Sequence, residues 1–406
     1  MKNNYKPKPH FKEKIESLLE NKQDIKKFWE ISKKGIQKSI RCNTLKISIE
    51  NLKEKLESKG WKINQPFKNN PEIMIIEGKY PTNHNKKINT KNLSKKDLLL
   101  TKKTAKDSSE VESEATISTS KVDLISLEPG ELGRSIEHLL GYYYVQEIAS
   151  MMPPLALSPK PGEIILDLCS SPGSKTTQIA SMMENQGTII ANDNKLGRIS
   201  ILNTNLERCG VSNTIITRND GVQLCQKLEK INMKFDKILT DVPCSGEGNL
   251  RSSPKTLQMW NPKVIKILSK MQKKLASSAL NLLKVGGEMI YSTCTHSPEE
   301  NEEVLQHLKE NFNIEIEKIN LPIKCRPGLT KWNKPNMKDK SQERINEDKS
   351  QGNNILEINN KTDKGGLGGH LTKSKTFDPE IKNACRIWPQ DNNTEGFFLA
   401  KIRRLG

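Results

Sequence analysis

The stretch EIILDLCSSPGSKT, from Glu163 to Thr176, decides the fold. Its apolar start is typical of a buried strand, and a helical pattern follows over residues 175–184. A turn of small residues between a strand and a helix lets the backbone come close to a ligand. The glycine spacing is not that of a P-loop, and it differs from G-x-G-x-x-G, so dinucleotide binding is disfavoured.

Strands and helices alternate along the chain after this stretch. Unbroken apolar strands that alternate with helices predict an α/β fold with a doubly wound, mostly parallel, Rossmann-like sheet. The expected strands cover residues 163–168, 187–192, 213–217, 237–240 and 288–292, and the expected helices cover 175–184, 195–208 and 262–283.

The first part of the chain, residues 1–82, predicts a smaller α+β module. After an opening helical pattern, a strand-like run covers residues 39–45. Ser48 is expected to cap a helix that Gly60 stops, and an apolar run follows at residues 73–76.

Two polar segments divide the rest of the chain. Residues 83–121 and 334–375 contain few large apolar side chains and predict solvated insertions. The main domain is therefore expected over residues 122–333, and residues 376–406 are expected to complete it with a last strand at 396–402.

Composition limits the class of protein. The chain has 66 Lys and Arg against 48 Asp and Glu, a formal net charge of +18, which favours a polyanion such as nucleic acid. A lysine-rich composition alone also makes many proteins basic. No run approaches the roughly 20 apolar residues that span a membrane, and the N-terminus lacks the apolar segment of a signal peptide. We expect a cytoplasmic protein that does not bind membranes.

Acidic residues follow the expected strands. Asp193 stands 20 residues beyond Gly173, where an acid binds a ribose in such folds, and Asp220 and Asp241 follow the next two strands. For each acid taken alone, a helix cap or turn residue is the favoured explanation. Together they predict an adenosine-bearing ligand, and Arg198 is either a contact of that ligand or a surface charge.

The eight cysteines are scattered, with no C-x-x-C pair and no Cys/His cluster at zinc spacing. This predicts reduced thiols and no metal. Cys244 directly follows the fourth expected strand, and Cys294 directly follows the fifth. A free cysteine at a strand end is often only a small buried residue. Two of them beside one ligand edge favour a shared reactive site.

Several segments of the chain carry motifs in a fixed order. They are Asp167–Thr176 against D-x-C-A-A-P-G-G-K-T, Asp241–Gly248 against D-x-P-C-S-G-x-G, Thr293–Glu302 against T-C-S followed by x-x-x-E-N-E, and Arg41–Thr44 against R-x-N. Together they resemble the Nop/Sun (Fmu-type) family of RNA cytosine-5 methyltransferases. The departures are Ser174 for a second glycine and Thr295 for a serine, and neither removes a functional group.

The resemblance implies a class I methyltransferase fold, S-adenosyl-L-methionine as methyl donor, and an N-terminal module that binds tRNA or rRNA. It implies that Cys294 is the nucleophile and that Cys244 aids product release. The cofactor contacts that it implies are Cys169, Ser170, Ser171, Pro172, Gly173, Ser174, Lys175, Asp193, Arg198, Asp220 and Asp241.

Two thiols and an acid suit this chemistry. Carbon 5 of cytosine is too weak a nucleophile to attack a sulfonium methyl group, but a thiolate that adds to carbon 6 activates it. Asp241 can hydrogen-bond ring nitrogen 3, and a basic pocket that includes Lys175 can lower the pKa of the attacking thiol. The proton on carbon 5 then leaves with help from the second thiol or a water.

Contact with RNA is harder to assign from the sequence. The target carbon is hidden in a stacked helix, so the cytosine must be unpaired or flipped out. Arg403 and Arg404 are candidates to grip the RNA backbone, or they are only solubilising charge. The run Tyr142–Tyr144 can stack on a base, but packing is the favoured interpretation there, as it is for Trp260 and Trp388.

Three other functions remain as alternatives. DNA cytosine-5 methyltransferases carry their nucleophile in the Pro-Cys after strand four, whereas the Thr-Cys at Cys294 favours RNA. A ribosome-assembly factor that binds RNA without catalysis has no need for intact Cys244, Cys294 and Asp241. A thiol–disulfide redox protein normally has a C-x-x-C motif, which is missing here.

Overall fold

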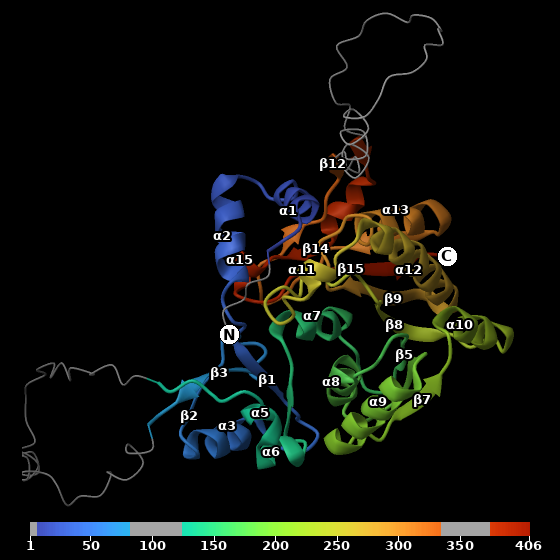
Figure 1. Ribbon diagram of the computed structural model, residues 1–406. Helices are drawn as coiled ribbons and strands as arrows, with labels where there is room; N and C mark the ends of the chain where they lie inside the picture. Colours follow the sequence, from blue (N-terminus) through green and yellow to red (C-terminus); the bar gives the residue numbers. More distant parts are fainter. Residues whose placement is uncertain (1–5, 82–123, 334–373) are drawn as a thin grey trace, which may run out of the picture. The chain divides into compact units, whose positions relative to one another are not determined.

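The computed structural model describes residues 6–81, 124–333 and 374–406. It forms two compact units (Figure 1). The larger unit comprises Met1–Ile36, Ala149–Asn203 and Asn213–Gly406, and the smaller one comprises Gln37–Ile148 and Thr204–Ser212.

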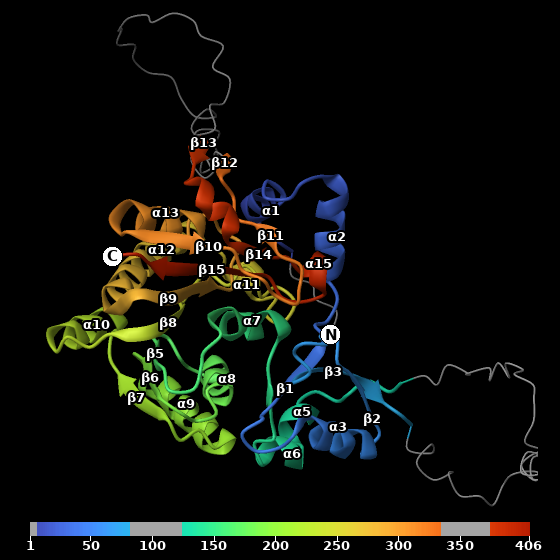
Figure 2. The ribbon, with the colours of Figure 1, turned by 180° about the vertical axis from the view of Figure 1, so that it is seen from behind.

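A nine-stranded sheet forms the centre of the larger unit (Figure 2). Its order is β11-β14-β15-β9-β8-β5-β6-β7, with β10 paired to β15. Neighbours from β7 to β9 are parallel, whereas β15 joins β9 in the antiparallel sense. The strands are β5 (Ile164–Asp167), β6 (Thr188–Asp193), β7 (Thr214–Arg218), β8 (Phe235–Asp241), β9 (Leu283–Thr293), β10 (Ile314–Glu317), β11 (Arg326–Pro327), β14 (Cys385–Ile387) and β15 (Phe397–Arg404). The predicted fold class is confirmed.

Helices cover both faces of this sheet. Figures 1 and 2 show α10, α12 and α13 on one face and α7 and α8 on the other. Their bounds are α7 (Ile148–Leu157), α8 (Ser174–Met182), α9 (Leu196–Cys209), α10 (Gly221–Lys230), α11 (Thr256–Met259), α12 (Pro262–Leu282), α13 (Glu302–Asn311), η1 (Pro379–Asn383) and α15 (Pro389–Asn392). The three predicted helices are present, and the sequence analysis missed α10 and α13.

Two N-terminal helices, α1 (Pro9–Glu16) and α2 (Lys22–Ser32), belong to the larger unit. The sequence analysis placed them in the N-terminal module. The physical reason for the difference is apolar packing, because Phe11 and Phe28 are buried in one cluster with Trp260 and Trp388. Burial of such rings stabilises the protein, so these helices pack where their aromatic partners lie and not beside the segment that follows them in the chain.

The smaller unit is an antiparallel sheet with short helices. The predicted cap is present, since Ser48 Oγ accepts a hydrogen bond from Asn51 N at 3.2 Å, and Gly60 has a left-handed φ of 82° where the helix has ended. The strand order is β2-β3-β1-β4. The elements are β1 (Lys38–Cys42), α3 (Ile49–Ser58), β2 (Trp61–Asn64), β3 (Ile73–Lys79), α5 (Glu131–Arg134), α6 (Ile136–Leu139) and β4 (Tyr143–Val145).

The predicted polar insertions lie almost wholly outside the described residues. At the end of the second one, β13 (Ser374–Thr376) pairs with β12 (Lys331–Asn333). No helix in the part of the chain that the structure describes is both long and apolar enough to cross a membrane.

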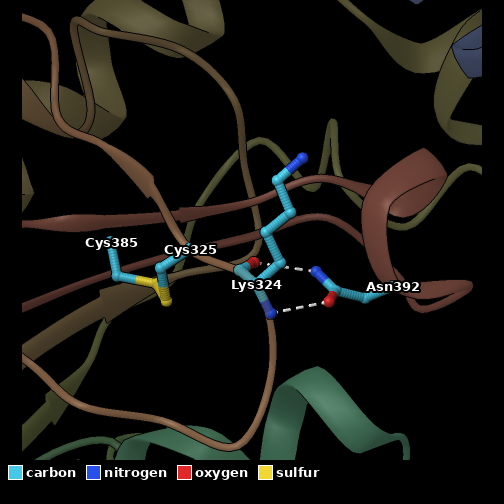
Figure 3. The surroundings of a disulfide bond; sticks show 4 residues. All are labelled: Lys324, Cys325, Cys385 and Asn392. Carbon is cyan, nitrogen blue, oxygen red and sulfur yellow. Dashed lines mark hydrogen bonds between the residues drawn. A yellow bond between two sulfur atoms is a disulfide. The ribbon is translucent and has the colours of Figure 1, made fainter.

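A disulfide joins Cys325 to Cys385 across 60 residues of sequence (Figure 3). Beside it, the backbone of Lys324 makes two hydrogen bonds with the Asn392 side chain, at 2.8 and 2.9 Å. The expectation that all thiols are reduced is therefore wrong for this pair. The pairing is long-range and lacks a C-x-x-C spacing, so the sequence alone did not reveal it.

The aromatic residues take the structural role that the sequence analysis favoured. Tyr143 is fully buried, and its hydroxyl donates to Leu132 O at 2.7 Å. Trp260 is 5% exposed and Trp388 is 1% exposed. These rings pack within their own units and do not present a free face to a base.

Candidate active site

The turn after β5 lies against the end of β6. Ser170 N and Ser170 Oγ both donate to Asn192 O, at 2.8 and 2.9 Å. Gly173 precedes α8 with φ 101°, a left-handed conformation that favours glycine. Burial raises the pKa of Cys169 well above its ordinary value, so this thiol stays protonated. The turn consists of small residues fixed by hydrogen bonds to the end of β6, and its cysteine is not a reactive thiolate.

Asp193 and Arg198 hold this turn together. Arg198 Nε lies 3.0 Å from Asp193 Oδ2, and an Arg198 amino group donates to Ser171 O at 2.6 Å. Asp193 Oδ1 also accepts from Lys195 N at 3.1 Å. Arg198 is therefore more than a surface charge, because it joins an acid at the end of β6 to the turn after β5.

Asp220 caps a helix. Its Oδ1 accepts from Val222 N and Gln223 N at the start of α10, each at 3.1 Å, and the residue is exposed. This is the cap that the sequence analysis gave as an alternative to ligand binding. Asp220 lies just after β7, at the carboxyl edge of the sheet.

The two cysteines at the strand ends are in contact. Cys244 Sγ lies 3.0 Å from Cys294 Sγ, and Cys294 N donates to Cys244 Sγ at 3.3 Å. Asn249 Nδ2 also donates to Cys294 Sγ at 3.2 Å. The loops after β8 and β9 thus bring two thiols and one amide donor together.

The hydrogen bond between the thiols separates their acidities. It lowers the pKa of Cys294, and the Asn249 amide and the charge of Lys175 act in the same direction. The same hydrogen bond, together with burial, raises the pKa of Cys244 well above its ordinary value. A thiolate is the reactive form of cysteine. The Cys294 thiol therefore loses its proton more readily than the Cys244 thiol.

Asp241 lies beside this pair with its carboxylate oriented by two donors. Lys175 Nζ is 2.7 Å from Asp241 Oδ2, and Ser292 Oγ donates to Asp241 Oδ1 at 2.8 Å. The Lys175 ammonium group also lies over the Phe397 ring, 5.4 Å from its centre. Lys175 therefore touches the acid at the end of β8 rather than standing free in the turn.

Several residues of this site were missed in the sequence. Asn249 follows the Asp241–Gly248 motif directly and looked like an ordinary loop residue. Ser292 lies two residues before Cys294 and Thr295 directly follows it, and their hydroxyl groups donate to Asp241 and to Glu247 respectively. Their positions could have indicated a role in the site. Ser292 and Thr295 lie within two residues of Cys294, and Asn249 directly follows the end of a motif.

Comparison with known protein families covers the part of the chain that carries this site. The family model for the 16S rRNA methyltransferase RsmB/F matches residues 154–403. The chain belongs to the 16S rRNA methyltransferase RsmB/F family. This confirms the predicted family and the predicted class of enzyme, an RNA methyltransferase.

Two relatives illustrate the range of enzymes to which the chain is similar. The chain is 37% identical over 272 residues to the tRNA (cytosine(49)-C(5))-methyltransferase of Pyrococcus abyssi. The matched residues cover 67% of this chain and 73% of the relative. It is 35% identical over 309 residues to the Ribosomal RNA small subunit methyltransferase F of Vibrio campbellii, covering 76% of this chain and 54% of the relative. The chain thus spans about half the length of its Vibrio relatives.

Solved structures agree with this fold. The methyltransferase homolog protein from Pyrococcus horikoshii has a TM-score of 0.63 and 28% identity, covering 98% of this chain and 100% of that one. NSun6 from Pyrococcus horikoshii with SFG has a TM-score of 0.67 and 22% identity, covering 98% of both chains. At that lower identity the likeness concerns the fold alone.

Proposed function

We propose that this protein transfers a methyl group from S-adenosyl-L-methionine to carbon 5 of a cytosine in tRNA or rRNA, with Cys294 as the nucleophile. The observation that carries the proposal is the contact of Cys244 and Cys294 at 3.0 Å, beside Asp241 at the carboxyl edge of the parallel sheet. Ligands bind at that edge in open α/β sheets.

The residues at this edge fit the proposed cofactor. The glycine turn at Gly173 leaves room for close approach of a ligand. Asp167 Oδ1 is buried and has no hydrogen-bond partner in the described part of the chain, and burial raises the pKa of this carboxyl to about 7. A cationic ligand group suits such a site. When bound, S-adenosyl-L-methionine supplies the methyl group.

In the proposed mechanism, the Cys294 thiolate adds to carbon 6 of the base and forms a carbon–sulfur bond. Asp241 and nitrogen 3 share a proton, and the ring electrons move to carbon 5. Carbon 5 takes the methyl group as the methyl–sulfonium bond breaks. A water held beside the Cys244 thiol then takes the proton from carbon 5. The carbon–sulfur bond breaks, the double bond between carbons 5 and 6 returns, and Cys294 is free again.

Two variants test this assignment. Cys294→Ala should abolish methyl transfer while cofactor binding, measured by calorimetry, is retained. Cys244→Ala should release product slowly, so that a covalent RNA–protein adduct is visible on a denaturing gel. Full turnover in Cys294→Ala would mean that the other thiol attacks, as in the DNA-modifying alternative.

The identity of the RNA is a separate part of the proposal. The names of the relatives include both tRNA and rRNA enzymes, which supports either substrate. Bisulfite sequencing of total RNA from a strain that lacks this gene should show one or a few cytosines that have lost methylation. An unchanged methylation pattern would favour the assembly-factor alternative.

We propose RNA binding by the smaller unit as well, since its residues 37–81 carry eight lysines. Arg403 is a weaker candidate than the sequence indicated, because it is paired with Glu317 and lies 2.8 Å from Glu288. A cytoplasmic location belongs to the same proposal, because the relatives are named as enzymes that modify tRNA and ribosomal RNA.

A further inference from the structure

Lys14 is a lysine of α1 that is completely buried in the larger unit. Its Nζ lies 2.9 Å from Glu299 Oε2 and 3.5 Å from Glu247 Oε1, and it donates to Ser297 Oγ at 2.5 Å. Burial opposes the charge of Lys14, but Glu247 and Glu299 raise its pKa above the ordinary value. The side chain is thus held as a cation inside the protein.

Glu247, its partner, connects the two loops that carry the thiols. Glu247 lies three residues after Cys244, and its Oε2 accepts from Thr295 Oγ1 at 3.1 Å. Thr295, next to Cys294, also shares a hydrogen bond of 2.8 Å with Ser245, next to Cys244. Any shift of the Glu247 carboxylate therefore acts on both loops at residues adjacent to the cysteines.

The charge in this region depends on Lys14. Glu247 and Glu300 are fully buried, and Glu299 is 9% exposed. Nearby Glu302 has its own cation, Arg386. Lys14 lies within ion-pair distance of both Glu247 and Glu299. Without Lys14, the fully buried Glu247 carboxylate would lose this ion pair, which costs free energy and would let the carboxylate move away from Thr295.

We propose that Lys14 is a positioning residue of the active site, whose ion pair holds the Glu247 carboxylate between the two loops and so fixes the spacing of Cys244 and Cys294. The proposal rests on the proposed function for its effect on methylation. Its effect on the thiols is independent of any RNA. The N-terminal helix α1 is thereby part of the catalytic machinery rather than of a separate binding module.

The test compares Lys14→Met, Glu247→Gln and the double variant with wild type. Iodoacetamide alkylation of Cys294 is followed against pH by peptide mass spectrometry, and single-turnover methylation is measured on the same proteins. Lys14→Met should move the Cys294 alkylation midpoint to higher pH. It should also lower the methylation rate at least about tenfold, with KM for RNA changed by no more than about twofold.

The matched control is Lys12→Met on the same helix, because the Lys12 side chain is 55% exposed and makes only an ion pair of 3.8 Å with Glu16. It should leave the alkylation midpoint of Cys294 where it is in wild type. Circular dichroism establishes that each variant is folded.

The double variant keeps the test decisive if Lys14→Met does not fold. The double variant leaves one carboxylate, Glu299, without Lys14, whereas Lys14→Met leaves two, so the double variant should be the more stable of the two. Its losses should match those of Glu247→Gln alone because both residues act through one contact. Losses that multiply, or a folded Lys14→Met with the wild-type midpoint, would overturn the proposal. If wild type methylates no RNA, the proposed function fails, and the alkylation profile still decides the role of Lys14.

Discussion

Cys244 and Cys294 are fifty residues apart in the chain, yet their sulfur atoms lie 3.0 Å from each other. Each follows a neighbouring parallel strand, β8 or β9, so the sheet itself brings them to one edge. Because the hydrogen bond between them lowers the pKa of Cys294 and raises that of Cys244, two equal side chains become chemically different. That difference is what covalent catalysis with two thiols requires.

Asn249 should support the nucleophile. Its amide donates to Cys294 Sγ at 3.2 Å, and a hydrogen bond to a charged group contributes roughly 1.5–3 kcal/mol. Asn249→Ala should therefore raise the alkylation midpoint of Cys294 and slow methylation about tenfold at neutral pH. Asn249→Asp, of the same size but negatively charged, should slow it further. Wild-type rates in both variants would show that the amide does not stabilise the thiolate.

Asp220 has two possible roles that one pair of variants separates. Serine is a good N-cap, so Asp220→Ser should keep α10 capped while it removes the carboxylate, whereas Asp220→Ala should also destabilise the protein by about 1 kcal/mol. If Asp220 contacts the cofactor, both variants should bind S-adenosyl-L-methionine more weakly in calorimetry. If Asp220→Ser binds S-adenosyl-L-methionine with wild-type affinity, the role of Asp220 is only to cap α10.

The disulfide should contribute strongly to stability. Closing a loop of 60 residues is worth about 4 kcal/mol in the chain-entropy account. A reductant should lower the free energy of unfolding of the wild type by up to that amount in urea titrations. The double variant Cys325→Ala/Cys385→Ala should be insensitive to reductant. Equal responses of the two proteins would mean that the bond does not form in solution.

Glu300 should make stability depend on pH. Burial, with the charge of Glu247, raises its pKa from 4.5 to about 7. Between these two pH values the folded state holds a proton that the unfolded state has lost. The stability that Glu300 contributes in this way is full below pH 4.5 and is lost as the pH rises through 7.

Glu300→Gln removes this titration. Relative to wild type, its free energy of unfolding should increase by up to about 3 kcal/mol between the two pKa values. Urea titrations at a series of pH values measure the difference between the two proteins. A difference that stays constant across that range would contradict the shifted pKa.

The sheet and its reactive edge were predictable because they depend on local patterns. Runs such as residues 163–168 are apolar without interruption, and a parallel sheet brings the residues after its strands together. Hence Asp241, Cys244 and Cys294 were placed correctly without any knowledge of distances. Helix α10 was missed because its buried positions, Leu224 and Cys225 among them, are few within a polar stretch.

Long-range packing was not predictable from the same patterns. The helical period of α1 marked Phe11 as buried, but nothing in it showed that the partner was Trp260, 249 residues away, and not the neighbouring α+β module. Lys14 looked like one more solvated lysine in a basic chain. Its burial depends on Glu247 and Glu299, which only the folded structure brings to it.

The most direct test of the central claim uses the RNA that the wild-type enzyme methylates, made with 5-fluorocytidine. Fluorine cannot leave carbon 5 as the proton does, so the enzyme should remain joined to the methylated base. Digestion and mass spectrometry then identify the peptide that carries the nucleotide. We predict that the nucleotide is attached to Cys294. Attachment to Cys244, or no covalent product from an active enzyme, would contradict the account.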